Sequence, residues 1–382
     1  MLACLGGVYA WSAFVPPLRD LGGLTAAQAQ LVFGVGVLAF TVVMLGSGPA
    51  QERWSPRWVA LLGGFLFGLG YLVASTSRAQ FSGLLLGIGV LSGAGIGCAY
   101  ISALATAMKW FPSHRGAVAG LTVAAFGSGA ILLANGAQAL FHRGFGVLEV
   151  FRLVGLGFGP LTMLCALLLF APPSGETEPV HRSLSLRRVF ASRDWRILSL
   201  GIFSGTFAGL LVIGNLKPIG LAGGVEPAHA LHAITGFSVG NALGRLLWGW
   251  IVDRLGRAAI SLSLAFLTAA VAALALPQLG ALFPLIAALV GFGFGSCFVV
   301  YAAQVAERFG ARAVGKVYPL VFVSYGISGL TAPFIGGWFF DLWGTYLPAI
   351  LTAAAITALA ALLCWRLDAP VKGLAIDTAG RQ

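Results

Sequence analysis

The sequence has few charged residues: Asp, Glu, Lys and Arg make up 9% of its 382 residues, against 58% for apolar types. A water-soluble domain carries about a quarter of its residues as charges, so this composition excludes a soluble globular protein. The charges lie in short clusters between long uncharged runs. Such runs are long enough to cross about 30 Å of hydrocarbon as helices, and we therefore expect a protein that spans a membrane many times.

Cysteine is also scarce, and the five cysteines lie far apart within apolar runs, at Cys4, Cys98, Cys165, Cys297 and Cys364. This pattern favours free thiols over disulfides or a metal cluster. The glycine-rich stretches lie inside apolar runs and lack the Lys-Ser/Thr ending of a phosphate-binding loop. His229 and His232 have no third ligand nearby for zinc. We expect no metal, no cofactor and no enzymatic activity.

The uncharged runs predict helices, because in lipid a helix satisfies its backbone groups within one segment, and the alternation of membrane strands is absent. The predicted fold class is an all-α membrane protein with twelve transmembrane helices. The first span starts without the charged region of a signal peptide, so we expect it to be a structural helix. The spans are residues 2–20, 28–50, 57–77, 80–108, 115–141, 147–171, 194–218, 229–252, 257–276, 280–306, 314–340 and 346–366.

Lysine and arginine are distributed unevenly over the predicted loops. If the N-terminus is cytoplasmic, the inner loops and termini carry seventeen of these residues and the outer loops five. Because positive residues accumulate on the cytoplasmic side, both termini are predicted there, in a plasma or inner cell membrane. This bias, together with anionic lipid as a partner, explains the net charge of +11, so we expect no nucleic-acid binding.

The long polar segment at residues 172–193 predicts a cytoplasmic linker. It divides the chain into an N-terminal six-helix bundle (1–171) and a C-terminal six-helix bundle (194–366), followed by a cytoplasmic tail (367–382). The halves repeat in sequence, since Gly48–Arg53 matches Gly249–Arg254 at an offset of 201 residues. Each copy ends in an acid and an arginine that can pair across the inner face and latch one state. The predicted gating residues are Asp253, Arg254, Arg257, Glu52 and Arg53.

The stretch Gly249–Arg257 resembles the loop signature of the major facilitator superfamily, and the resemblance covers essentially the whole chain. Three other stretches resemble the branch that holds the oxalate/formate antiporters and the monocarboxylate transporters: Tyr9–Ser12, Trp110–Pro112 with Arg115-Gly116, and Asn241–Arg245. The resemblance implies two pseudo-symmetric bundles. A site between repeated halves is typical of carriers that work by alternating access.

Arg245 lies about seven residues, roughly 10 Å, above the cytoplasmic end of its predicted helix. A charge at that depth is costly unless it is compensated, yet all twelve acids fall at predicted helix ends or in loops. We therefore expect Arg245 to bind a carboxylate of the substrate through two parallel hydrogen bonds. The alternative is a structural arginine held by backbone carbonyls and hydroxyls.

Asn241, one turn earlier, is expected to orient Arg245 or to contact the ligand. In animal monocarboxylate transporters this position is typically an aspartate involved in proton coupling, so the proton-carrying residue is left open here. Tyr325 stands where we align a second cation, a lysine, of the oxalate carriers. A single cation favours a monoanion such as lactate or pyruvate, to which Tyr325 can donate a hydrogen bond. Further pocket candidates, with packing as the alternative, are Tyr9, Trp11, Tyr100, Phe126 and Tyr301.

These features predict a monomeric secondary transporter of small monocarboxylates. Proton symport is the expected coupling, because a proton and a monoanion together make the cycle electroneutral. One alternative is exchange of organic anions of the oxalate/formate type. Another is a carboxylate sensor that transports nothing, which lacks support because the sequence has no long soluble signalling domain.

Overall fold

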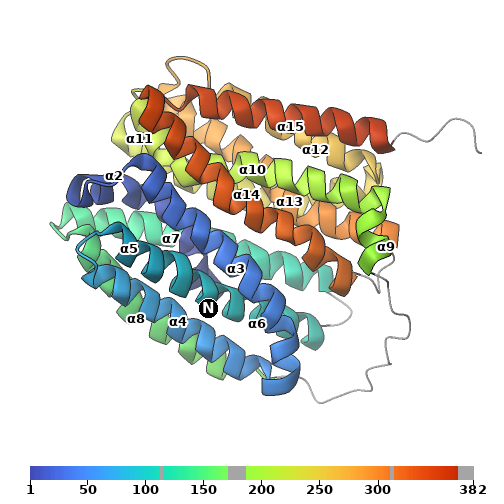
Figure 1. Ribbon diagram of the computed structural model, residues 1–382, viewed down its shortest axis with the longest axis horizontal. Coiled ribbons are helices and arrows are strands. Elements are labelled where there is room, and N and C mark those ends of the chain that lie inside the picture. Colours follow the sequence, from blue (N-terminus) through green and yellow to red (C-terminus); the bar gives the residue numbers. More distant parts are fainter. Residues whose placement is uncertain (112–114, 171–185, 310–313, 369–382) are drawn as a thin grey trace, which may run out of the picture.

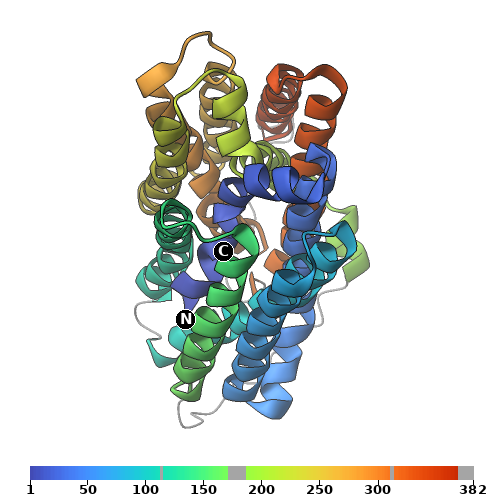
Figure 2. The same ribbon diagram turned by 90° about the vertical axis from the view of Figure 1, so that its left-hand side faces the viewer.

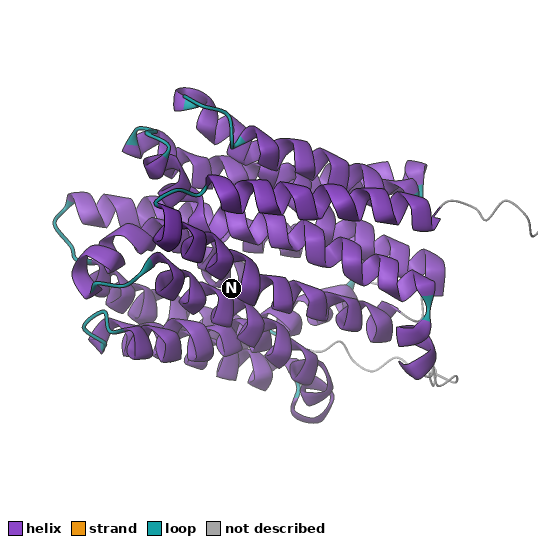
Figure 3. Ribbon diagram, turned by 45° about the horizontal axis from the view of Figure 1, so that its top comes forward, coloured by secondary structure: helices purple, strands orange, loops and turns teal. Residues whose placement is uncertain are grey.

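The computed structural model describes residues 1–111, 115–170, 186–309 and 314–368. This described part consists of helices joined by short loops and contains no strand (Figure 3). The long helices run roughly side by side in an elongated bundle (Figure 1). Residues 172–185 of the predicted linker and 369–382 of the predicted tail lie outside the described residues.

The helices before the linker form the lower part of the bundle in Figure 1 and those after it the upper part. The first set comprises α1 (Leu2–Leu5), η1 (Gly6–Ala10), α2 (Trp11–Gly22), α3 (Ala26–Trp54), α4 (Pro56–Thr76), α5 (Phe81–Leu84), η2 (Leu85–Ser92), α6 (Gly93–Trp110), α7 (Arg115–His142) and α8 (Val147–Leu167). The second comprises α9 (Leu186–Ala191), α10 (Arg193–Ala222), α11 (Pro227–Leu255), α12 (Ala258–Ala273), η4 (Gly280–Leu282), α13 (Phe283–Phe309), α14 (Val314–Trp343) and α15 (Leu347–Asp368).

Each predicted span coincides with a helix or with consecutive helical pieces. In the described residues, nine helical segments are long and apolar enough to cross a membrane, and α12 is a shorter apolar helix. The remaining two predicted spans are α11 and the composite segment from α1 to α2. The predicted all-α membrane fold is confirmed.

Two spans that we expected to be continuous α-helices change their hydrogen-bonding pattern. The first passes through a 3-10 turn, η1, where the backbone of α7 comes so close that a side chain at Gly6 would overlap the carbonyl oxygen of Phe126. The fourth contains a π-helical stretch, η2. The short helix α9 lies inside the predicted linker. Apolar content predicts that a segment crosses the membrane, but it carries no information about such local changes.

The two sets of helices meet mainly where α3 packs on α14 and α7 on α11. Small residues allow this approach, since a Cβ at Gly34 of α3 would lie 2.7 Å from the carbonyl oxygen of Leu330 of α14. We call the end of the bundle with α9 and the last turn of α15 the linker end. The opposite end, with the loops at residues 23–25, 77–80, 143–146 and 223–226, is the far end, which faces the viewer in Figure 2.

The turns that follow α3 and α11 both hold a residue at positive φ. Ser55 has φ 75° and ψ 150°, and Gly256, 201 residues later, has φ 50° and ψ −126°. Glycine adopts positive φ at no steric cost, whereas a residue with a Cβ is strained there. The two turns therefore share a positive φ but differ in ψ, and only the second has glycine, the residue that suits a positive φ.

Candidate functional site

Arg245 lies on α11 and is buried, with 4% of its surface exposed. Its Nε donates a hydrogen bond of 3.0 Å to Oδ1 of Asn241, one turn earlier on the same helix. Its Cζ lies 4.3 Å from the ring centre of Phe298 on α13, a cation–π contact. The amide thus sets the rotation of the guanidinium and the ring covers one of its faces. Within electrostatic range of the guanidinium lie Tyr9, Tyr100, Tyr318 and Tyr325.

Three glycines of α11, spaced four residues apart, bring this helix against α13. A side chain at Gly240 would overlap the carbonyl oxygen of Ala288, and one at Gly244 would overlap that of Phe292. Gly236 makes the same kind of contact one turn earlier. We call Gly236, Gly240 and Gly244 the glycine ladder. Small residues at this spacing let membrane helices touch backbone to backbone, and here the contact places Phe298 beside Arg245.

Aromatic side chains from the first half form a wall of the site. Tyr9 of η1 packs edge-to-face on Phe126 of α7, with ring centres 5.6 Å apart. Tyr100 of α6 lies 5.1 Å from Phe126 and 5.3 Å from Phe40 of α3. All four of these residues are buried. The break in the first span is what brings Tyr9 to this wall, because Gly6 lets η1 lie directly on α7.

Tyr325 of α14 joins this wall to the second half. Its hydroxyl lies 2.9 Å from the hydroxyl of Tyr9, and its ring stacks on Phe322 at 4.8 Å. The ring also lies 5.8 Å from Phe298 and 6.2 Å from Phe40. The two halves therefore meet through a pair of hydroxyls next to the buried arginine. We call the whole group the central cluster: Tyr9, Phe40, Tyr100, Phe126, Asn241, Arg245, Phe294, Phe298, Tyr318, Phe322 and Tyr325.

The structure places two of the predicted pocket residues elsewhere. The indole Nε1 of Trp11 donates to the carbonyl oxygen of Ala29 on α3 at 3.1 Å, so this ring ties α2 to α3. Tyr301 packs towards α10, where a Cβ at Gly201 would lie 2.5 Å from its hydroxyl. The other predicted pocket residues belong to the central cluster.

Sequence reasoning missed five aromatic members of the central cluster, although helical spacing and the sequence repeat together pointed to all five. Tyr318, Phe322 and Tyr325 are spaced four and three residues apart, which places them on one face of a helix. Phe294 and Phe298 are likewise four residues apart. Phe40 stands 201 residues before Asn241, the same offset as the sequence repeat.

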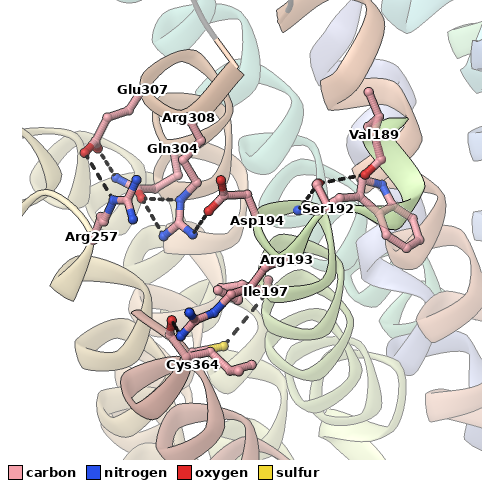
Figure 4. Close-up of polar contacts among 12 residues, drawn as sticks. Val189, Ser192, Arg193, Asp194, Ile197, Arg257, Gln304, Glu307, Arg308 and Cys364 are labelled. Carbon is pink, nitrogen blue, oxygen red and sulfur yellow. Dashed lines mark hydrogen bonds and ion pairs between the residues drawn. The ribbon is translucent and has the colours of Figure 1, made fainter. Parts of the chain in front are cut away.

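The predicted gating residues occupy the linker end. Arg257 Nε lies 3.9 Å from Oε1 of Glu307 on α13, as Figure 4 shows. Arg254 stacks on the ring of Trp250, with its Cζ 3.4 Å from the ring centre. Asp253 and Arg53 are exposed, and the side chain of Glu52 lies outside the described residues.

A second group of polar contacts at the linker end connects α13 to α10. Arg308 Nη1 donates to Oδ1 of Asp194 at 3.0 Å, and Arg308 Nε donates to Oε1 of Gln304 at 3.1 Å (Figure 4). The side chain of Arg308 is fully buried. These contacts join helices of the second half to one another, so they hold that half together at its linker end.

Fold and site together define a helical membrane transporter, with a buried cation where two repeated halves meet. Residues 1–223 and 198–381 match the Major Facilitator Superfamily, and the chain belongs to this superfamily. It is a multi-pass membrane transporter and not an enzyme.

Relatives narrow the position of the chain within the superfamily. It is 24% identical to the oxalate:formate antiporter of Oxalobacter formigenes, covering 97% of this chain and 91% of that protein. It is 28% identical to human monocarboxylate transporter 11, covering 88% and 74%. The solved structure of the transporter FucP in the outward conformation matches with a TM-score of 0.63 at 18% identity, over 97% of this chain and 98% of that chain. The superfamily and branch indicated by the sequence motifs are confirmed.

Proposed function

We propose that this chain is a secondary transporter that moves a small monocarboxylate, of the lactate or pyruvate type, across the cell membrane by alternating access. The observation that carries the proposal is the setting of Arg245, a buried guanidinium oriented by Asn241 inside a cluster built by both halves. A guanidinium binds a carboxylate through two parallel N–H···O bonds, which are strong where water is excluded.

The composition of the central cluster supports a monoanion with a short apolar part. Arg245 supplies one positive charge, and the paired hydroxyls of Tyr9 and Tyr325, 2.9 Å apart in the same cluster, can donate a hydrogen bond to a hydroxy or keto group of the ligand. The surrounding phenylalanine rings suit a methyl group. The names of the two relatives mention oxalate, formate and monocarboxylates, all of which are carboxylates.

Proton symport is the coupling that we propose. A monoanion that enters together with a proton leaves the transport cycle electroneutral, and the tyrosine hydroxyls beside Arg245 offer a network through which a proton can be shared with the substrate. Exchange of organic anions is the second candidate, because the similarity to the oxalate:formate antiporter extends over nearly the whole chain.

In this proposal the transporter works as a monomer whose bundles, residues 1–171 and 194–366, rock about the central cluster. The linker end faces the cytoplasm, in keeping with the excess of lysine and arginine in its loops. Labelling of intact cells with a membrane-impermeant maleimide tests this orientation. A cysteine that replaces Arg143 at the far end should react from outside, and one that replaces Arg187 on α9 should not. The reverse pattern contradicts the orientation.

Uptake of labelled lactate or pyruvate into proteoliposomes tests the function. Acceleration by an inward proton gradient supports symport, and acceleration by internal anion without any effect of the gradient supports exchange. Binding of lactate or pyruvate without uptake would identify a sensor. Absence of both binding and uptake for these monocarboxylates contradicts the proposed substrate class.

A further inference from the structure

Asp341, near the end of α14, caps a helix that belongs to the other half of the molecule. Its Oδ1 accepts a hydrogen bond from the backbone N–H of Ala26 at 2.9 Å, and its Oδ2 accepts one from Ala27 at 2.8 Å. Ala26 and Ala27 are the first two residues of α3. Both carboxylate oxygens thus bind the start of a helix 314 and 315 residues away in the chain.

The cap of α3 is completed by this carboxylate. The first N–H groups of a helix have no partner within it. In α3, Thr25 Oγ1 accepts from the N–H of Gln28 and Gln28 Oε1 accepts from the N–H of Thr25, each at 3.1 Å. This capping box serves two of the four donors, and Asp341 serves the other two. Its negative charge also lies at the positive end of the helix dipole, which adds to the attraction.

The surrounding contacts hold the last turns of α14 against the first half. A Cβ at Gly337 would lie 2.5 Å from the carbonyl oxygen of Ala26, so the two backbones touch there. The ring centre of Phe340 lies 5.2 Å from Cζ of Arg19 on α2. These contacts and the bonds of Asp341 lie together at the far end, where they join α14 to α2 and α3.

We propose that Asp341 is the latch that holds the far end of the transporter shut. The inference rests on the alternating-access cycle proposed above. Opening of the far end requires α14 to leave α3, and both bonds of Asp341 must then break. The energy of this cap is present in the closed state and absent from the open one, so it sets the population of the open state. Asp341 touches no substrate and acts through the position of α14.

Distances between two spin labels across the far end test the latch without any substrate. Cysteines that replace Gln80 in the first half and Gln278 in the second are suitable sites. Both residues are exposed; Gln80 lies in the far-end loop 77–80, and Gln278 lines a pocket with Gly223 of the far-end loop 223–226. In this background, Asp341→Ala should raise the ratio of open to closed distances about tenfold, which corresponds to a loss of about 1.4 kcal/mol. Asp341→Asn retains one acceptor oxygen and should give an intermediate ratio.

Glu149 provides a matched control for the loss of a helix cap. Its Oε2 accepts from the N–H of Gly146 at 2.7 Å, so this carboxylate caps its own helix, α8, within the first half. Glu149→Ala and Asp341→Ala should lower the Tm of the purified protein by similar amounts. Only the change at Asp341 should shift the distance distribution, which separates a latch from a residue that merely stabilises the fold.

Three results would contradict the proposal that Asp341 holds the far end shut. In the first, Asp341→Ala has the same ratio of open to closed distances as the parent protein, and the parent protein still takes up substrate in a way that depends on Arg245. The latch is then refuted and the proposed function is not. In the second, Glu149→Ala opens the far end as much as Asp341→Ala does. In the third, the parent and every variant show a single closed distance; alternating access then fails as well, which distinguishes this result from the first.

Discussion

The two halves of the transporter share a scaffold and differ in chemistry where their repeats face each other. Asn241 and Arg245 of α11 correspond, 201 residues earlier, to Phe40 and Met44 of α3. Phe40 nevertheless lies in the central cluster, 6.2 Å from Tyr325. The same helical turn of the repeat thus provides an amide and a guanidinium in one half and an aromatic and an apolar side chain in the other. In the proposed transport cycle, the second half anchors the anion and the first half closes over it.

The largest expected effect on uptake comes from replacement of Arg245, the proposed anchor of the anion. Arg245→Gln should lower the uptake efficiency of lactate or pyruvate at least about 100-fold, because a buried carboxylate would lose its charged partner. Arg245→Lys keeps the charge but not the two parallel bonds, and should recover little. Initial rates in proteoliposomes measure both. Arg143→Gln, a change at an exposed arginine of the far end, should leave uptake within about twofold. Normal uptake by Arg245→Gln would refute the site.

Removal of the Asn241 amide, which orients Arg245, should reduce uptake less than removal of Arg245 itself. Asn241→Ala deletes the acceptor of the Arg245 Nε bond and should raise KM about tenfold, the usual effect of losing one hydrogen bond to a charged group. The maximum rate should change less, since the guanidinium itself remains. Uptake measured over a range of substrate concentrations separates the two quantities. An unchanged KM would show that Asn241 does not position Arg245.

Loss of a hydroxyl from the Tyr9–Tyr325 pair should reduce uptake less than loss of the Asn241 amide. Tyr9→Phe and Tyr325→Phe each remove one hydroxyl and should each lower uptake efficiency about fivefold. Because the hydroxyls act as a pair, the double variant should be little worse than either single one. Tyr71→Phe changes a buried tyrosine that packs on Phe151 in the first half, and it should have no effect. Fully additive losses would contradict a shared role.

The smallest effect is expected at the repeated turns. Ser55→Gly removes the strain of positive φ and should stabilise the protein by about 1 kcal/mol, seen as a small rise in the Tm of the detergent-purified transporter. Gly256→Ser should lower the Tm, because it introduces that strain into the other copy. Opposite signs at the two turns would show that both positions are held at positive φ. A fall in Tm for Ser55→Gly would contradict it.

Much of this molecule could be predicted because lipid restricts where charge can lie. Charges gather at the helix ends, so the uncharged runs marked the spans, and Arg245 stood out as a charge within one. Its bond to Asn241 was also predictable, since residues four apart meet on any helix. These features depend on segments of the chain taken one at a time.

Features that depend on helix rotation or on contact between distant segments were not predictable. Trp11 lies two residues from Tyr9, which places the two side chains on opposite sides of a regular helix. Trp11 bonds to α3 while Tyr9 enters the cluster, and which side of the first span faces the cluster depends on how that span is rotated in the bundle. Tyr301 was predicted to line the pocket from its residue type and its span alone. Apolar spans carry aromatic side chains on every face, so these two features do not show which way the side chain points. The contact of Asp341 with Ala26 requires the two halves to be docked.

The glycine ladder has a consequence for how selectivity can diverge. Because α11 and α13 touch through their backbones, Arg245 and Phe298 stay in fixed relation unless the two helices separate. Natural drift and directed evolution can therefore alter selectivity most easily on the opposite wall, at Phe40, Tyr100 and Phe126. Smaller residues there would enlarge the space beside an unchanged anion anchor. New carriers for bulkier organic acids should arise from such changes, in the half of the molecule that holds no charge in the central cluster.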